Sequence, residues 1–212
     1  MTELLIIAFG LTILYVVSTS RLEAYLQVLT LQGLLLALII ILDNYGRINS
    51  YEMLLHLFET LIVKAWMIPW LLGRVIKSTK TFREIEPFIS NLKSLAFISV
   101  LFFASLLLSY KSFDIAVVIN PLYFCISLST VISGLFIIMT RKKIITHVMG
   151  FLIMENGIFL MTLALSKKIP LIINLGIMLD VFIGVFILVM FISKIKTTFD
   201  ALHIDSLSEL RD

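Results

Sequence analysis

The sequence predicts an all-α, polytopic membrane protein, a bundle of about seven transmembrane helices. Of the 212 residues 60% are hydrophobic, and the mean hydropathy of +1.08 exceeds what the core and surface of a soluble domain require. Charged residues make up only 15% of the chain, and they gather between apolar runs of roughly 20 residues, the length that crosses a hydrocarbon core about 30 Å thick. The apolar surface must therefore face lipid.

Seven apolar runs are predicted to cross the membrane. They cover residues 4–18, 24–42, 51–76, 94–110, 115–139, 144–165 and 170–193. The first run lacks the basic segment and cleavage site of a signal peptide, so we expect it to remain as a helix. The prediction is a transmembrane bundle over residues 1–193 and a polar cytoplasmic tail over residues 194–212. Docking of this tail on a neighbouring subunit and disorder are both compatible with its composition.

Proline and glycine residues predict local features of these helices. Pro69 and Pro121 lie inside predicted helices, where the missing N–H donor permits a kink. Gly150 and Gly157 are seven residues apart, hence on one helix face, where they would let another helix approach closely. Helices one to three and five to seven have the same predicted orientation, so the bundle is compatible with two similar three-helix units joined by helix four.

The distribution of basic residues predicts the orientation. If the N-terminus lies outside, twelve Lys and Arg residues fall on the inner side and four on the outer side. Basic loops beside helix ends resist translocation, so we expect the N-terminus outside and the C-terminus in the cytoplasm. The net charge of +3 is explained by this topology, and nucleic acid is not an expected partner.

Four ionisable side chains are predicted near the middle of the bilayer: Glu59, Lys64, Glu155 and Asp180. In hydrocarbon such a group costs at least roughly 2.5 to 3.5 kcal/mol, so it usually faces the bundle interior or a water-filled path. Glu155 and Asp180 lie midway along two antiparallel helices joined by a short loop. They should therefore reach similar depth, close enough to approach one another.

Two histidines extend this set as candidate proton relays. Glu52, His56 and Glu59 have the spacing i, i+4 and i+7, which predicts a polar stripe running inward from the outer surface. His147 lies two turns from Glu155, nearer the cytoplasm, and could serve the same purpose from that side. The structural alternatives stay open, because an intramembrane acid can act only as an ion-pair partner and a histidine only as a packing residue.

Motifs for a soluble catalytic site are absent from the sequence. It contains no GxxxxGK phosphate loop, no dinucleotide glycine pattern, no metal-spaced Cys or His cluster and no nucleophile elbow. The single cysteine, Cys125, excludes a disulfide framework within the chain. We therefore expect no catalytic site and no bound cofactor or metal in this chain, and any redox chemistry belongs to its partners.

Helices six and seven carry a family resemblance. The segments MGFLIMENGIFLMTLAL and LGIMLDVFIGVFILVMF, the tail IDSLSELRD and the helix-three stretch VKAWMIPWLL resemble hydrogenase-4 component E, the membrane subunit of group 4 NiFe hydrogenase and formate hydrogenlyase complexes. From about Ile145 onward the chain also resembles the three-helix K subunit of bacterial complex I, in which two intramembrane glutamates serve proton translocation. Asp180 matches the second acid. Leu152 stands where the first would fall, and Glu155 is displaced from it by three residues.

The resemblance implies a function and partners. The chain would be a proton-translocating, energy-coupling subunit of a respiratory membrane-bound hydrogenase in the cytoplasmic (inner) membrane of a bacterium or archaeon. Implied partners are antiporter-like membrane subunits, a membrane anchor subunit and a peripheral arm with NiFe and iron–sulfur centres. Two other functions fit the same residues: a component of a multisubunit cation/proton antiporter, and a structural membrane scaffold.

Overall fold

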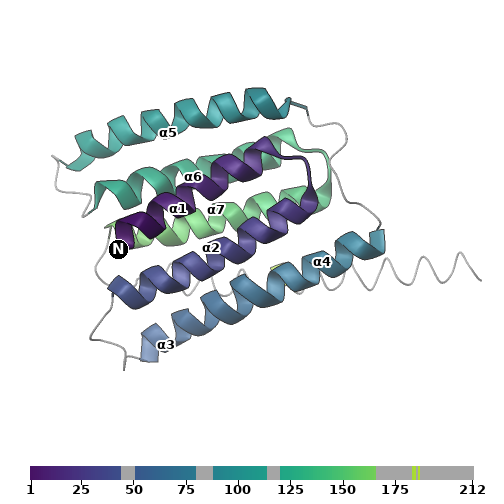
Figure 1. The fold of residues 1–212 in the computed structure, drawn as a ribbon, viewed down its shortest axis with the longest axis horizontal. Helices are drawn as coiled ribbons and strands as arrows, with labels where there is room; N and C mark the ends of the chain where they lie inside the picture. Colours follow the sequence, from purple (N-terminus) through teal and green to yellow (C-terminus); the bar gives the residue numbers. More distant parts are fainter. Residues whose placement is uncertain (44–50, 80–87, 114–119, 166–182, 185, 187–212) are drawn as a thin grey trace, which may run out of the picture.

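The computed structural model is all-helical in the part of the chain that it describes, residues 1–43, 51–79, 88–113, 120–165, 183–184 and 186 (Figure 1). The elements are α1 (Thr2–Ser18), α2 (Leu22–Asp43), α3 (Tyr51–Phe58), the π-helical η1 (Glu59–Met67), α4 (Ile68–Thr79), α5 (Asn91–Phe113), α6 (Pro121–Thr140) and α7 (Ile144–Leu165). Because α3, η1 and α4 are contiguous, the described residues form six rods. Four of them, α2, α5, α6 and α7, are each long and apolar enough to cross a membrane, so the chain is a membrane protein.

The predicted helices agree with these elements except at two places. The seventh predicted helix and the tail lie almost entirely outside the described residues, so the count of seven stays a prediction. The fifth predicted helix, 115–139, does not continue through its predicted first turns, because Asn120 is extended and Pro121 begins α6; the predicted kink at Pro121 is therefore wrong. Asn120 caps this helix by accepting a hydrogen bond from the backbone N–H of Leu122 at 3.1 Å, and a proline at the first helical position loses no hydrogen bond that the helix would otherwise make.

The rod of residues 51–79 changes its helical type in the middle. The chain is α-helical up to Phe58, π-helical over Glu59–Met67 and α-helical again from Ile68. A proline ring clashes with the carbonyl four residues before it, and Pro69 is the second residue after the π-helical segment. The proline therefore gives a local reason for the wider turns that precede it.

Each rod runs opposite to the one before it (Figure 1). The helix α1 packs on α2, α5 and α6, while α2 packs on η1, α4 and α7. Polar contacts confirm the arrangement at both ends of the bundle: the Tyr123 hydroxyl donates to Asp43 Oδ2 at 2.8 Å, and at the opposite end Asn91 Nδ2 donates to Ser20 Oγ at 2.7 Å. The order is that of an up-and-down bundle with α2 near its centre.

Glycines set the closest helix contacts. A Cβ atom on Gly134 of α6 would lie 2.7 Å from the Gly150 carbonyl oxygen and 2.7 Å from the Met154 nitrogen of α7, and one on Gly157 would lie 2.8 Å from the Val131 nitrogen. Only hydrogen fits at such distances, so the two backbones can touch. The close approach predicted at Gly150 and Gly157 is confirmed, and the partner helix is α6.

Another close contact involves α2, where a Cβ on Gly33 would lie 2.8 Å from the Ala65 nitrogen of η1. Gly33 thus packs against η1. If helices five to seven repeated helices one to three, Gly157 would align with Gly33, but Gly157 packs against α6. These two glycines do not support the repeat, which stays a prediction because helix seven is mostly outside the described residues.

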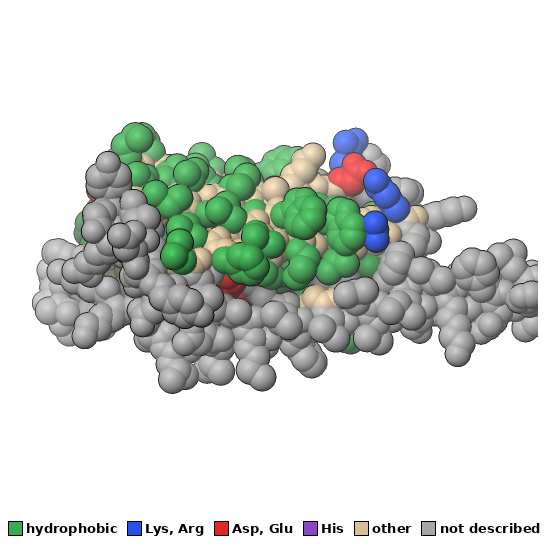
Figure 2. Space-filling view, turned by 90° about the horizontal axis from the view of Figure 1, so that it is seen from below, with side chains coloured by type: hydrophobic (Ala, Val, Ile, Leu, Met, Phe, Trp, Pro, Cys, Tyr) green, Lys and Arg blue, Asp and Glu red, His purple; other side chains and the backbone are tan. Residues whose placement is uncertain are grey.

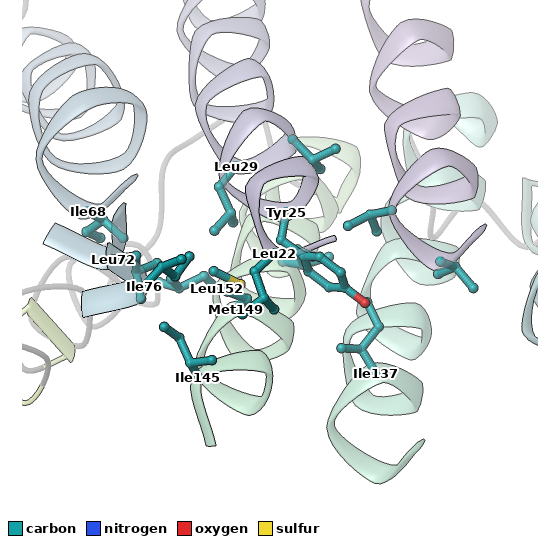
Figure 3. Close-up of a cluster of buried hydrophobic side chains, with 14 of the residues drawn as sticks. Leu22, Tyr25, Leu29, Ile68, Leu72, Ile76, Ile137, Ile145, Met149 and Leu152 are labelled. Carbon is teal, nitrogen blue, oxygen red and sulfur yellow. The ribbon is translucent and has the colours of Figure 1, made fainter. Parts of the chain in front are cut away.

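The larger apolar cluster lies around the start of α2. Figure 3 shows Leu22 and Tyr25 of α2 next to side chains of α7, with side chains of α4 on one side and Ile137 of α6 on the other. Ile68, Leu72 and Ile76 come from α4, and Met149 and Leu152 come from α7. This packing fixes α2, α4 and α7 relative to one another on the side of the bundle where η1 continues into α4.

Basic residues gather at one end of the bundle. In Figure 2 apolar side chains cover the middle of the face, and Lys and Arg side chains lie toward the end at the right of the view. This end carries the termini of α1, α4 and α6 and the starts of α2, α5 and α7. An apolar girdle with a basic end fits the predicted topology, in which this end faces the cytoplasm.

We expect Gly134→Ala to lower the thermal unfolding midpoint of the full chain in detergent. The added methyl overlaps the α7 backbone, and such overpacking costs about 1–3 kcal/mol. Gly73→Ala is the matched control, because a Cβ there would meet Leu26 Cδ1 at an ordinary 3.5 Å. Equal midpoints for the two variants would contradict the tight α6–α7 contact.

The orientation is testable with single cysteines in a Cys125→Ser background. Glu3→Cys lies at the start of α1 and Lys77→Cys near the end of α4, and both native side chains are exposed. A membrane-impermeant maleimide should label Glu3→Cys in intact cells and Lys77→Cys only after permeabilisation. The opposite pattern would place the N-terminus in the cytoplasm.

Candidate functional site

Four ionisable side chains meet inside the bundle. Lys64 Nζ donates a hydrogen bond to Glu155 Oε1 at 2.9 Å and lies 3.6 Å from Glu59 Oε1. His56 Nδ1 lies 3.7 Å from Glu59 Oε2. All four residues are buried, with exposed fractions of 2–5%. The array His56–Glu59–Lys64–Glu155 therefore holds two carboxylates, one ammonium and one titratable imidazole out of contact with bulk water.

The π-helical geometry of η1 places Glu59 and Lys64 on one face. In an α-helix residues five apart point about 140° away from each other, so the spacing of Glu59 and Lys64 would separate them. A π-helix bonds residue i to residue i+5, which stacks residues five apart. The change of helical type is thus what turns two intramembrane charges of one helix toward each other.

Lys64 of η1 contacts α7, and its neighbour Ala65 lies at the close contact between η1 and α2. On the α2 side, Ala65 packs against Gly33 and fixes the position of η1. On the α7 side, Phe159 lies one turn beyond Glu155, with its ring centroid 5.5 Å from Lys64 Nζ and 6.3 Å from the His56 ring. The aromatic ring offers both basic groups an attractive face or edge.

A second polar chain lies beside the charged array. Asn156 Nδ2 donates to Gln32 Oε1 at 3.1 Å, Gln32 Nε2 donates to Thr12 Oγ1 at 3.0 Å, and Thr12 Oγ1 donates to the Phe9 carbonyl at 2.6 Å. Gln32 is fully buried. The chain ties α7 to α2 and α1 through hydrogen bonds that satisfy polar groups inside an apolar bundle.

A small cavity joins the two polar chains. Its volume is about 10 Å³, and it is lined by Lys64, Asn156, Leu29, Ile68 and Leu152. Its two polar lining residues come from the two neighbouring networks: Lys64 belongs to the charged array, and Asn156 belongs to the amide chain. Leu152, at the position where the K-subunit resemblance implies an acid, contributes an apolar wall to this cavity.

The basic end of the bundle holds a buried guanidinium. Arg141, one of the twelve basic residues that the orientation count places on the inner side, is 2% exposed. Its Nη1 donates to Asn91 Oδ1 at 3.0 Å and its Nη2 to the Val17 carbonyl at 3.3 Å. The turn after α6 directs Arg141 between α1 and α5. It joins the ends of three helices.

The structure brings together four of the six predicted proton-transfer residues: His56, Glu59, Lys64 and Glu155. His147 lies apart, with Nε2 2.7 Å from the Arg141 carbonyl oxygen, and no contact within the described residues joins it to the array. Asp180 and the side chain of Glu52 lie outside the described residues, so the approach of Asp180 to Glu155 stays a prediction.

Sequence reasoning missed Gln32 and Thr12. A glutamine inside the apolar run of α2 was a usable signal, because an amide in a transmembrane helix needs a partner on another helix. The partner of Gln32 on α7 is Asn156. Nothing in the spacing of the residues indicated which helix would supply the partner.

The array can move protons in principle, because its members differ in charge and lie within short distances. Transfer of a proton from Lys64 Nζ to Glu155 Oε1 turns the ion pair into a neutral lysine and a neutral carboxylic acid. Lys64 can then accept a proton from a protonated Glu59 after a small side-chain rotation. The sum of the two steps moves one proton from Glu59 to Glu155, with the charge of Lys64 restored.

Comparison with known proteins gives two kinds of relative. An uncharacterised protein of Mycobacterium tuberculosis is 29% identical over 196 residues, which cover 90% of this chain and 87% of the relative. Hydrogenase-4 component E of Escherichia coli K12 is 28% identical over 86 residues, 41% of this chain and 40% of that protein, and the protein of that name from Shigella flexneri matches equally. No protein-family model and no solved structure matches. The chain is a membrane protein with a distant relationship to hydrogenase-4 component E.

Proposed function

We propose that the chain is a proton-translocating membrane subunit of a respiratory hydrogenase-type complex related to complex I. The observation that carries the proposal is the buried array His56–Glu59–Lys64–Glu155. Its members extend from His56 in α3 through η1 to the middle of α7, and two of its three links are longer than a direct hydrogen bond, at 3.6 and 3.7 Å. Small rearrangements can therefore make or break them.

The array has the composition that a relay needs. All four side chains are buried, and the links between them are 2.9, 3.6 and 3.7 Å long, so the charge of each group acts on its neighbours with little screening by water. A charge that moves in a neighbouring subunit would change which carboxylate holds the proton. The proposed partners are antiporter-like membrane subunits, a membrane anchor subunit and a peripheral arm that holds NiFe and iron–sulfur centres, and Asp180 is the proposed next carrier after Glu155.

A purely structural role is the main alternative. The Lys64–Glu155 hydrogen bond links η1 to α7, and this link favours a structural role. A scaffold would lose assembly when the acids are removed, and it would show no separate transport defect. An antiporter component would move sodium or potassium in vesicles that contain no hydrogenase. Both alternatives give results that differ from those expected for a redox-driven proton carrier.

The proposal predicts that Glu155→Gln abolishes redox-driven proton uptake by membrane vesicles that contain the complex. Loss of a positioned proton-transfer group lowers the rate by roughly 100-fold or more, whereas the amide keeps the size of the side chain. The double variant Glu155→Gln/Asp180→Asn tests the proposed pair. Glu23→Gln is the matched control, because it removes an exposed acid of α2.

Normal proton uptake in the assembled Glu155→Gln/Asp180→Asn variant would refute the carrier role. Failure of that variant to assemble, with uptake per assembled complex unchanged, would support the scaffold. Assembly is measured by co-purification of the redox subunits with the tagged chain.

Lys64→Met should destabilise the purified chain more than Glu155→Gln does. Lys64 is the cation shared by two buried carboxylates, and leaving buried charges without their partner costs about 3–5 kcal/mol. The measurement is the thermal unfolding midpoint in detergent. A Lys64→Met defect no larger than that of Glu155→Gln would argue against the charged array.

A further inference from the structure

An aromatic and basic column lies along the rod that η1 and α4 form. Trp66, Trp70 and Arg74 follow one another at intervals of four residues, which places them on neighbouring turns of one helix face. The two indole rings are stacked, with centroids 6.2 Å apart and an angle of 19° between their planes. The Arg74 guanidinium carbon lies 3.7 Å from the centroid of the Trp70 ring. The three side chains therefore form one continuous surface.

This column is exposed on a face of the rod that the charged array does not use. Trp66 is 65% exposed and Trp70 is 45% exposed, and Arg74 is also exposed. Lys64, only two residues before Trp66, is 4% exposed, so the array and the column lie on different faces. The ligand of the column is therefore a separate question from the interactions of the array.

The stacking on Trp70 uses the face of the Arg74 guanidinium and not its N–H donors. These donors lie in the plane of the group and match the oxygen atoms of a phosphate. Lys77 is exposed three residues further along α4 and adds a second positive charge on the same side of the helix. The ion pairs of the described residues include neither Arg74 nor Lys77. The charged end of the column is thus built to attract an anion.

The column has the length and the polarity of one half of the bilayer. From Trp66 to Arg74 a helix rises about 12 Å at 1.5 Å per residue, and one leaflet contributes about 15 Å of hydrocarbon. The Arg74 end lies toward the basic end of the bundle, because α4 ends there at Thr79. The indole rings therefore lie beside acyl chains, and the guanidinium lies toward the phosphates of the headgroups.

We propose that the column Trp66–Trp70–Arg74 binds an anionic phospholipid from the leaflet at the basic end of the bundle. The lipid phosphate accepts hydrogen bonds from the Arg74 guanidinium, and one acyl chain lies along the two indole rings. Charge complementarity favours an anionic lipid, because a zwitterionic headgroup brings a further cation to Arg74 and Lys77. The bilayer places phosphates at this level around the whole protein, whereas a partner subunit would have to supply a carboxylate there.

Tryptophan fluorescence reports on this site alone, because Trp66 and Trp70 are the only two tryptophans of the chain. The purified full chain is reconstituted into vesicles of phosphatidylcholine with a minor fraction of phosphatidylglycerol. This composition is kept constant, and bromine atoms, which quench indole fluorescence, are carried either by the phosphatidylglycerol or by an equal amount of the phosphatidylcholine. One basic group near the surface attracts an anionic lipid by a factor of roughly five. The local concentration of brominated lipid at the indoles should therefore be roughly five-fold higher when phosphatidylglycerol carries the bromine.

Two variants test the role of Arg74 in this preference. Arg74→Gln keeps a polar side chain but removes the cation, and it should lower the preference for the anionic lipid roughly five-fold. Lys93→Gln is the matched control, because it removes an exposed cation at the start of α5. The helix α5 starts at the same basic end but lies at the opposite edge of the bundle from α4 (Figure 1), so the preference should persist in this variant.

Equal quenching by the two brominated lipids in the wild type would overturn the proposal, and this comparison does not require any variant to fold. The column would then be an ordinary interfacial anchor without lipid selectivity. Quenching by neither lipid would show that protein covers the two tryptophans, and it would overturn the proposal as well. A preference that Arg74→Gln retains in full would exclude the proposed phosphate contact. The measurement involves no proton transport, so its outcome is independent of the proposed function.

Discussion

A lysine and a glutamate that form a hydrogen bond inside an apolar bundle restrict how the surrounding helices can pack. The Lys64–Glu155 hydrogen bond of 2.9 Å requires η1 and α7 to keep a fixed depth and rotation, because a buried charge that loses its partner is costly. The close contacts Gly33–Ala65 and Gly134–Gly150 hold the helices in this arrangement. Packing of small residues thus supports an interaction that would otherwise be unfavourable in a membrane.

The helix α2 lies near the centre of the bundle and contacts the helices that carry the polar interior. Gly33 lets η1 approach, and the adjacent Gln32 bonds to α7 and α1. Neighbouring residues of a helix point in different directions, so one short stretch of α2 can position both helices of the ion pair. This explains why a charged array and an uncharged amide chain lie side by side. The first supplies groups that titrate, and the second keeps a fixed hydrogen-bond order.

The two ends of the bundle are built differently from its middle. At the basic end Arg141 is buried among backbone and amide acceptors and joins α1, α5 and α6. At the opposite end Tyr123 of α6 bonds to Asp43 of α2. These contacts tie helix termini together, whereas the array in the middle combines one hydrogen bond of 2.9 Å with two longer contacts of 3.6 and 3.7 Å.

The sequence by itself determined the membrane class, the helices up to α7 within a few residues, and the intramembrane charges, because hydropathy and insertion cost act on each residue wherever its neighbours lie. Only the tertiary structure decided that Lys64 meets Glu155, that Gln32 meets Asn156 and that Arg141 is buried. Those pairs join residues far apart in the chain. Within η1, the approach of Glu59 to Lys64 depends on π-helical turns, which bring residues five apart onto one face. A pattern of 3.6 residues per turn separates Glu59 from Lys64, whereas the π-helical turns of η1 bring them together.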